Sequence, residues 1–499
     1  MPFIAKATNS LQTFGFSRSA GGLPPIGAPY FFSGDNVDMS YYPTSTTVDT
    51  SGNIYTLGYS NSPAMNASGY QSTVVQKVDS SGNLLWRNYL AGSNVVSPGN
   101  HTKSIAVDSS GNVYICGYFT LGGGTNQYGW IAKYNSAGTI QWQKSIQGSY
   151  NTYGNNILVD SSGNIYVAGN TLHNDSCTIY NSFWIAKLDS SATTIWRLFK
   201  GVTTSGSADS ANIVDMQFDS SGNIIVLCNP SSYNIGLFKI QASDGSTLTY
   251  SGKQYPSLPS TQYSFPQGMT LDNSNNVYVS GLIAAYWNPY CCSPTTGYYG
   301  YIIKMNSSFG IQSTYTIAST DGFYKVNTTR VVYDGIDSIY LNAEGQLSTG
   351  TNALLFKLAT SDLSVSRKEK FQTQTSGTPG QPTAINNYAK YSVDRSGNIY
   401  GSYSVGVSPG YQLYTSKLPK DNSKLGTYSI VVSGVTTWSL FYQSTTAYTF
   451  TSQSAPAAHS SSAVSFSASA YAYGNAGLTS GAVSSLSLTY GPTRGVVVI

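Results

Sequence analysis

The sequence predicts an all-β protein, built as a seven-bladed β-propeller with a small C-terminal β-rich domain. Three observations carry this prediction. A short signature recurs seven times, at spacings of 52 to 62 residues. No run of about 18 apolar residues is present, so no membrane-spanning helix is expected. Hydrophobic residues make up 40% of the chain and aromatic residues 13%, enough to bury a core.

The signature reads as two short strands joined by a tight turn. It runs from TVDTSGNIYTLGY at Thr47 to SVDRSGNIYGSYS at Ser392, with a degenerate sixth copy, VYDGIDSIYLNAE, at Val332. In Asp-Ser-Ser-Gly-Asn, the Asp side chain accepts hydrogen bonds from backbone donors and the Gly takes positive φ. The alternation of Ile-Tyr-Val-Ala-Gly then predicts a strand. One Asp marks each copy: Asp49, Asp108, Asp160, Asp219, Asp272, Asp334 and Asp394.

The second half of each repeat predicts two further strands. A short apolar run ends in Lys, a polar turn follows, and the next strand often carries Trp, as in WIAKYNSAGTIQW from Trp130. A single four-stranded meander cannot bury both of its faces, whereas seven stacked around an axis bury them against one another. The repeated cations are Lys77, Lys133, Lys187, Lys239, Lys304, Lys357 and Lys417.

The unit D-S-S-G-N-I/V-Y-V-x-G followed by I-A-K-L-D…W resembles the seven-bladed propeller repeats of bacterial and phage proteins. The resemblance spans residues 44–430. Residues 1–43 are expected to be an arm, a closure strand or an anchor. Residues 431–499 alternate apolar or aromatic residues with Ser, Thr or Ala. That pattern predicts a C-terminal β-rich domain, either a small sandwich or an extension that pairs with neighbouring chains.

The repeated Asp and Lys residues are interpreted as scaffold. A calcium loop needs several carboxylates, and most of these turns offer one, so no metal is expected. Strand order places the signature Asp and the Lys of a repeat at the same rim, where they can pair within or between blades. A solvated Lys and a ligand-binding Lys are the alternatives.

The loops of the opposite rim are long, variable and rich in Tyr, Ser, Gly and Asn. This mixture suits a recognition surface, because Tyr gives a large contact area at low entropic cost. It suits inert surface or packing within an assembly equally well. The largest loop, IAAYWNPYCCSPTTGYYG from Ile283, supplies the candidate binding residues: Tyr286, Trp287, Tyr290, Tyr298 and Tyr299.

The scarcity of charge disfavours catalysis and nucleic-acid binding. Charged residues make up 9% of the chain, with three His and two Glu, and the net charge is +4. An ordinary globular chain carries about 25%. No Walker loop, G-x-S-x-G elbow or H-E-x-x-H motif occurs, and no cofactor is expected. Converging carboxylates for glycoside hydrolysis remain an alternative; the non-repeat candidates are Asp175, Asp209, Asp215 and Asp321.

The whole pattern resembles virion proteins of tailed bacteriophages, including marine phages and cyanophages. The resemblance implies a non-enzymatic tail, fibre or capsid-surface component that is a homo-oligomer or present in many copies. Its expected partners are other virion proteins and a host-surface glycan or protein. The first residues do not form a signal peptide, so synthesis in the host cytoplasm without membrane insertion is expected. The alternatives are a secreted or cell-surface adhesin and a glycan-acting propeller enzyme.

Overall fold

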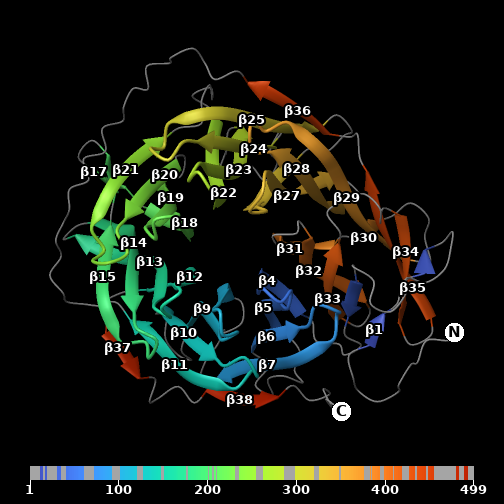
Figure 1. Ribbon diagram of the computed structural model, residues 1–499, viewed down its shortest axis with the longest axis horizontal. Helices are drawn as coiled ribbons and strands as arrows, with labels where there is room; N and C mark the ends of the chain where they lie inside the picture. The colour runs from blue at the N-terminus through green and yellow to red at the C-terminus, as the bar shows by residue number, and fades with distance from the viewer. Residues whose placement is uncertain are drawn as a thin grey trace.

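In the computed structural model, short β-sheets are arranged radially around a common centre, which is the architecture of a β-propeller (Figure 1). No described residue belongs to a helix long and apolar enough to cross a membrane. The structure describes residues 12–14, 17–18, 31–34, 41–60, 72–92, 102–120, 127–147, 151–175, 178–200, 202–204, 207–209, 211–230, 235–253, 262–285, 298–319, 325–347, 350–375, 382–383, 385–393, 398–407, 410–418, 426–432, 435–444, 448–453, 479–482 and 488–492.

Each repeat contributes an antiparallel meander, whose first strand lies nearest the centre (Figure 1). The first three repeats form β4 (Tyr41–Val48), β5 (Ile54–Ser60), β6 (Ser72–Val78) and β7 (Leu84–Gly92); β8 (Thr102–Val107), β9 (Val113–Thr120), β10 (Gln127–Tyr134) and β11 (Ile140–Gln147); and β12 (Asn156–Val159), β13 (Ile165–Asp175), β14 (Thr178–Leu188) and β15 (Thr194–Lys200). A hairpin, β16 (Val202–Thr204) and β17 (Ser207–Asp209), follows β15.

The remaining repeats follow the same order. They form β18 (Ala211–Phe218), β19 (Ile224–Pro230), β20 (Ile235–Ile240) and β21 (Thr247–Lys253); β22 (Gln262–Leu271), β23 (Val277–Ala285), β24 (Tyr298–Met305) and β25 (Ile311–Ser319); β26 (Lys325–Tyr333), β27 (Ser338–Leu347), β28 (Gly350–Ala359) and β29 (Val365–Thr375); and β31 (Ile385–Val393), β32 (Ile399–Val407) and β33 (Gly410–Leu418). The short strand β30 (Pro382–Thr383) pairs with β29.

The count of separate blades is six, not the seven that the number of repeats predicts. Among the described residues, the strands form six sheets of four or more strands. The difference arises between the fifth and sixth repeats, whose meanders belong to one 13-stranded sheet. A parallel bridge between Tyr298 of β24 and Lys325 of β26 joins them. Seven sequence repeats therefore do not give seven separate sheets, because this bridge connects two neighbouring meanders.

Strands from the N-terminal segment complete the ring where its ends meet. The seventh repeat supplies three strands, and β3 (Phe31–Gly34) pairs with β33 as the next strand outward. Strand β1 (Gln12–Phe14) pairs in turn with β3. Strand β2 (Ser17–Arg18) pairs with β34 (Gly426–Val432). Residues from both ends of the chain are thus hydrogen-bonded to the sheets of the ring.

Strands near the C-terminus lie on the outside of the ring (Figure 1). Strand β35 (Val435–Ser444) pairs with β34 and with β29 of the sixth repeat. The three that follow each pair with an outer strand of one repeat: β36 (Tyr448–Gln453) with β25, β37 (Thr479–Ala482) with β11, and β38 (Leu488–Pro492) with β7. The described part of residues 431–499 thus extends existing sheets.

The hydrophobic core lies between successive meanders. Tyr55 and Leu57 of the first repeat pack with Ile105, Val113 and Ile115 of the second, and all five are buried. The corresponding clusters follow around the ring between the second and third, third and fourth, fourth and fifth, and fifth and sixth repeats. The meanders of the second to fifth repeats therefore bury both faces, which explains why their apolar residues are not confined to every second position.

Candidate functional site

The signature turns and the turns between the third and fourth strands lie at one rim, here called the signature rim. In the first repeat, the amide of Gly52 donates to the Asp49 carbonyl at 3.0 Å, and Gly52 has φ +78°. The Asp49 Oδ1 atom accepts from the amides of Ser51 and Asn53, each at 2.9 Å. The same contacts recur at Asp108, Asp160 and Asp219. In the fifth repeat Asn275 takes the positive φ, at 60°. The Asp is thus the organising residue of its turn.

In the first, second, third and fifth repeats, the second carboxylate oxygen of the signature Asp accepts a hydrogen bond from the Tyr that follows six residues later. The Tyr55 hydroxyl donates to Asp49 Oδ2 at 2.9 Å. Equivalent bonds join Tyr114 to Asp108, Tyr166 to Asp160 and Tyr278 to Asp272, at 3.0 to 3.2 Å. Burial, followed by the hydrogen bond to Asp49, raises the pKa of Tyr55 above its usual value. The phenol therefore stays protonated and serves as a hydrogen-bond donor.

The repeated Lys lies over the face of this Tyr ring. The Lys77 Nζ atom is 5.1 Å from the centroid of Tyr55, and Lys133 is equally far from that of Tyr114. Lys187, Lys304, Lys357 and Lys417 lie 5.3 to 6.0 Å from the equivalent rings. These distances fit a cation–π contact. The Asp and Lys of one repeat do converge, but an aromatic ring stands between them.

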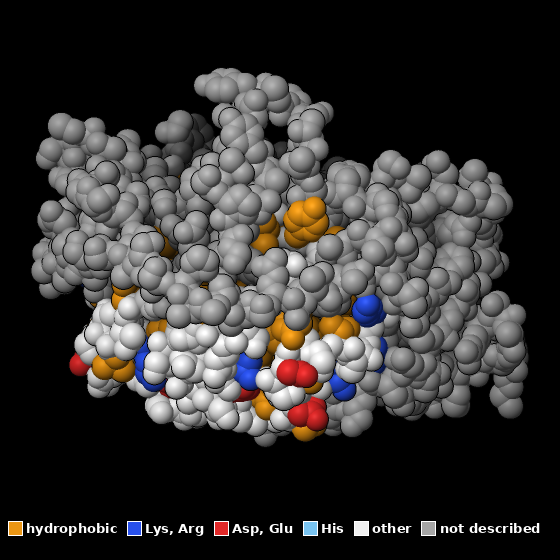
Figure 2. Space-filling model, turned by 90° about the horizontal axis from the view of Figure 1, so that it is seen from above, with side chains coloured by type: hydrophobic (Ala, Val, Ile, Leu, Met, Phe, Trp, Pro, Cys, Tyr) orange, Lys and Arg blue, Asp and Glu red, His pale blue; other side chains and the backbone are white. Residues whose placement is uncertain are grey.

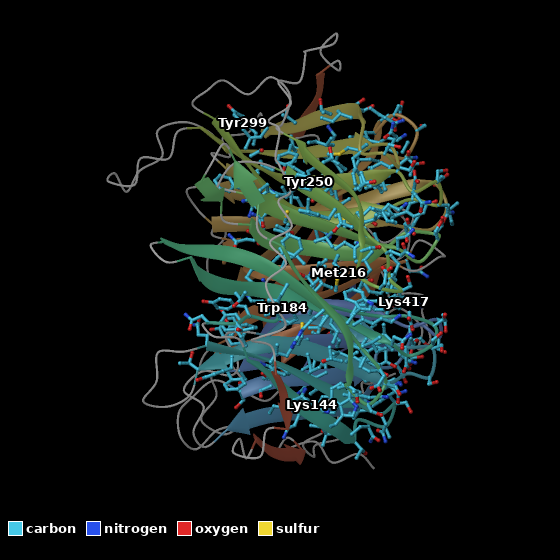
Figure 3. All side chains as sticks on the ribbon, turned by 90° about the vertical axis from the view of Figure 1, so that its left-hand side faces the viewer. Lys144, Trp184, Met216, Tyr250, Tyr299 and Lys417 are labelled. Atoms are coloured by element: carbon cyan, nitrogen blue, oxygen red, sulfur yellow. The ribbon has the colours of Figure 1, made fainter. Side chains whose placement is uncertain are left out.

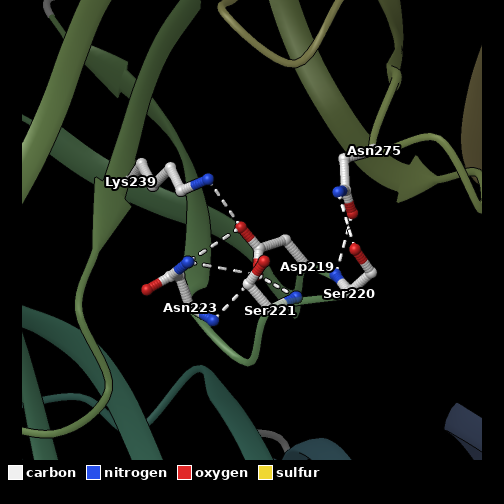
Figure 4. Close-up of polar contacts among 6 residues, drawn as sticks. All are labelled: Asp219, Ser220, Ser221, Asn223, Lys239 and Asn275. Carbon is white, nitrogen blue, oxygen red and sulfur yellow. Dashed lines mark hydrogen bonds and ion pairs between the residues drawn. The ribbon is translucent and has the colours of Figure 1, made fainter.

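The fourth repeat has a direct ion pair instead. Its sequence carries Ile225 where the other repeats carry Tyr, and Lys239 Nζ lies 2.7 Å from Asp219 Oδ2 (Figure 4). The Asp219 side chain is 1% exposed and that of Lys239 25%. Burial alone would raise the pKa of Asp219, but hydrogen bonds from Lys239 and Asn223 outweigh it, so this pKa is lowered. The missing phenol hydroxyl leaves Asp219 Oδ2 open to the ammonium group.

Polar groups of one repeat also reach the neighbouring repeat. Lys187 donates to the Ala242 carbonyl at 3.1 Å, and Lys304 donates to the Thr360 carbonyl at 2.7 Å. The indole nitrogens act in the same way: Trp86 donates to Ser136, Trp142 to Ser190, and Trp196 to Ala242, all at 3.1 or 3.2 Å. Each acceptor is a carbonyl in or beside the third-to-fourth strand turn of the next repeat. These bonds fix the spacing of adjacent meanders at the signature rim.

Two of the turns between the third and fourth strands require glycine because of both close packing and backbone conformation. A Cβ atom on Gly138 would lie 2.7 Å from the Trp86 ring, and one on Gly245 would lie 2.8 Å from the Trp196 ring. Both glycines also have positive φ, +82° and +78°. The turn therefore packs its backbone directly against the Trp of the preceding repeat.

The innermost strands carry two further charged residues, Arg330 and Asp215. Arg330 of β26 donates to the Thr46 carbonyl of β4 at 3.4 Å, and burial lowers its pKa although the Asp215 charge opposes that shift. Asp215 of β18 accepts the amides of Met216 and Met269, at 2.8 and 3.0 Å. The carboxylate of Asp215 thus holds backbone of the fourth and fifth repeats together. Asp215 and Arg330 thus both bond to backbone groups of the propeller. The sequence pattern does not indicate these contacts.

Most residues predicted to form a binding loop lie outside the described part of the chain. Tyr286, Trp287 and Tyr290 are among these. Tyr298 and Tyr299 begin β24, and Tyr299 is 39% exposed. Figure 3 shows Tyr299 and Lys417 toward opposite rims of the ring. Tyr299 thus lies at the rim opposite the signature turns, here called the loop rim.

The other predicted residues are placed as follows. Asp394 of the seventh signature and Asp321 lie outside the described residues. Asp175 ends β13, and Asp209 ends β17. Within the described ranges, no three His, Cys, Asp or Glu side chains gather in a way that could hold a metal ion. The described surface in Figure 2 carries scattered charges among hydrophobic and uncharged side chains.

One comparison with known proteins, that with family models, agrees with the propeller architecture. The family model described as a beta-propeller repeat matches residues 86–118 and 146–175. No curated protein matches the chain. Among solved structures, a periplasmic gluconolactonase of Pseudomonas aeruginosa is similar, with a TM-score of 0.42 and 10% identity over 79% of this chain and 99% of that one. A member of the DUF4221 family from Bacteroides vulgatus has a TM-score of 0.34 and 11% identity, over 67% and 93% of the two chains. The arrangement of the sheets shows that this protein has a β-propeller fold, and two of its segments match the beta-propeller repeat.

Proposed function

We propose that this protein is a non-enzymatic structural protein of a bacteriophage virion, which assembles through its propeller and contacts the host surface with its loop rim. The observation that carries the proposal is the use of the repeated charges. In the described repeats, the signature Asp residues organise turns, and the Lys residues lie over Tyr rings or pair with Asp219. These groups serve the scaffold, so recognition falls to the Tyr-rich loops. The assignment to a phage follows from the resemblance described above.

Tyr299 is the described residue best suited to such a contact. It is a large aromatic side chain with 39% of its surface exposed, at the start of the strand that follows the predicted binding loop. Exposed Tyr residues are frequent in recognition surfaces because a rigid ring contributes area and a hydroxyl group together. The candidate partner surface is a host glycan or protein, and other virion proteins contact the rest of the propeller.

Mass spectrometry of purified particles tests the proposal. The protein should be present at a fixed copy number per particle after gradient purification, and antibodies against it should label intact particles. Its absence from the particles would contradict a virion role.

The alternative function is a glycan-acting enzyme. Substitution of Asp215 tests this alternative. Because both oxygens of Asp215 accept backbone amides, Asp215→Asn should lower stability without abolishing any activity. Release of reducing sugar from host polysaccharide by the wild type, abolished in this folded variant, would favour the enzyme.

A further inference from the structure

The innermost strands of five repeats contain one extra residue at the same place. This β-bulge falls five residues before the signature Asp, and its extra residues are Thr44, Lys103, Val214, Gln267 and Thr329. A bulge turns a side chain out of the regular alternation of its strand. Among these five residues only Lys103, in the second repeat, is charged. Its ammonium group is therefore an addition to the repeated scaffold.

Lys103 lies over an aromatic ring, but its surroundings differ from those of the scaffold lysines. Its Nζ atom is 5.6 Å from the centroid of Tyr118, which is half-buried, and Lys103 itself is exposed. The scaffold residue Lys133 instead covers the buried ring of Tyr114, whose hydroxyl donates to Asp108. Among the described residues, no carboxylate forms an ion pair with Lys103. This cation is thus accessible to an anion from outside the scaffold.

Four half-buried tyrosines lie in the same part of the loop rim as Lys103. In the first repeat two rings stack with centroids 4.9 Å apart, and two rings of the second and third repeats meet edge to face at 4.6 Å. A contact of 3.0 Å between the hydroxyls of Thr44 and Thr102 joins β4 of the first repeat to β8, the strand of Lys103. The tyrosine–lysine cluster is defined by these five residues: Tyr42, Tyr59, Lys103, Tyr118 and Tyr153.

Backbone contacts hold the segment that carries Tyr153 in place. The Tyr153 amide donates to the Asn170 carbonyl at 2.8 Å, and the amide of the next residue, Gly154, donates to the Gly117 carbonyl at 3.3 Å. Gly169 permits this approach, because a Cβ atom there would overlap the Tyr153 carbonyl. The segment is therefore ordered before a ligand arrives, which lowers the entropic cost of binding.

We propose that the tyrosine–lysine cluster binds an acidic glycan. The Lys103 ammonium group donates to a sugar carboxylate, which gives a charge-assisted hydrogen bond. The C–H face of a sugar ring packs against the Tyr rings and the phenol hydroxyls bond to sugar hydroxyls, because tyrosine offers apolar and polar surface together. This assignment rests on the recognition role proposed above for the loop rim, and it adds the class of ligand.

The charge of Lys103 favours an acidic ligand over a neutral one. Although Lys103 contacts solvent, burial by the protein around it lowers its pKa. A carboxylate bound beside the ammonium group compensates for this loss of hydration, whereas a neutral sugar offers only hydroxyl groups.

Isothermal titration calorimetry on the full chain tests the proposal with two oligosaccharides of equal length. Hexagalacturonate, whose sugars each carry a carboxylate, should bind roughly tenfold more tightly than neutral maltohexaose. Lys103→Met should remove this preference, whereas Lys103→Arg should keep it. Tyr153→Ala should weaken the binding of both oligosaccharides. Lys144→Met removes the same charge from β11 of the same repeat, so it is the matched control and should bind like the wild type.

Two results would overturn the proposal. The first is equal binding of hexagalacturonate by the wild type and by Lys103→Met with an unchanged melting temperature, which would show that the cluster is not the site. The second is tighter binding of hexaglutamate than of hexagalacturonate, which would assign the cluster to an acidic peptide. Neither result bears on the virion role, because mass spectrometry of purified particles tests that role separately.

Discussion

The fourth repeat and the repeats around it use the same two charged positions in different ways. In the second repeat the Tyr114 hydroxyl donates to Asp108, and Lys133 lies over the Tyr114 ring. In the fourth repeat Ile225 replaces the Tyr, and Lys239 contacts Asp219 directly. The difference teaches that the second Asp oxygen, which also accepts from the Asn side chain of the turn, takes a further contact from either a phenol or an ammonium group. The side chain six residues after the Asp, which is Tyr114 in the second repeat and Ile225 in the fourth, determines which of the two groups contacts the Asp.

The largest expected effect comes from removing the Lys of the fourth repeat. Lys239→Met leaves the buried Asp219 carboxylate without its cation, so it should lower the free energy of unfolding by about 2–3 kcal/mol. The matched change Lys133→Met removes only a cation–π contact and should cost about 1 kcal/mol or less. Urea unfolding of the two variants measures both values. Equal losses would show that the ion pair and the cation–π contact are equivalent.

A second substitution can give the fourth repeat the Tyr that it lacks. Ile225→Tyr supplies a phenol hydroxyl to Asp219, as in the first, second, third and fifth repeats. In this background the additional cost of Lys239→Met should fall from about 2–3 to about 1 kcal/mol. A double-mutant cycle measured by urea unfolding gives the difference. If the cost of Lys239→Met stays the same, the Tyr is not what determines the geometry of the pair.

The ion pair also predicts a dependence on pH. The pKa of Asp219 is lowered in the folded protein, so its contribution to stability is present above the unfolded pKa of about 3.9 and is lost as the pH falls through the folded value. The difference in melting temperature between the wild type and Asp219→Asn should therefore shrink between pH 5 and pH 2, as thermal unfolding can show. A constant difference over this range would contradict the lowered pKa.

A smaller effect is expected from the phenol hydroxyl. Tyr114→Phe keeps the ring beneath Lys133 and removes the donor to Asp108, so it should cost about 1 kcal/mol in urea unfolding. The control is Tyr299→Phe, which changes an exposed ring at the loop rim and should leave stability unchanged. A loss at Tyr299 as large as that at Tyr114 would remove the distinction between scaffold and loop tyrosines.

Much of the scaffold could be predicted from the sequence because it repeats. The turn at each Asp, the strand that follows it and the four-stranded meander all follow from local residue chemistry. The signature contains the Tyr, but it does not indicate that the Tyr ring lies between Asp and Lys, because that position depends on strand pairing. The bridge from Tyr298 to Lys325 and the outer strands β36, β37 and β38 depend on contacts between distant segments. No local pattern specifies such contacts.

A comparison of one scaffold variant with one loop variant separates the roles of the two rims. Lys239→Met and Tyr299→Ala are each assayed for melting temperature and for binding to host cells. The account predicts that Lys239→Met lowers the melting temperature while the folded protein still binds, and that Tyr299→Ala binds more weakly with an unchanged melting temperature. Unchanged binding by Tyr299→Ala, together with lost binding by folded Lys239→Met, would contradict the account by placing recognition at the signature rim.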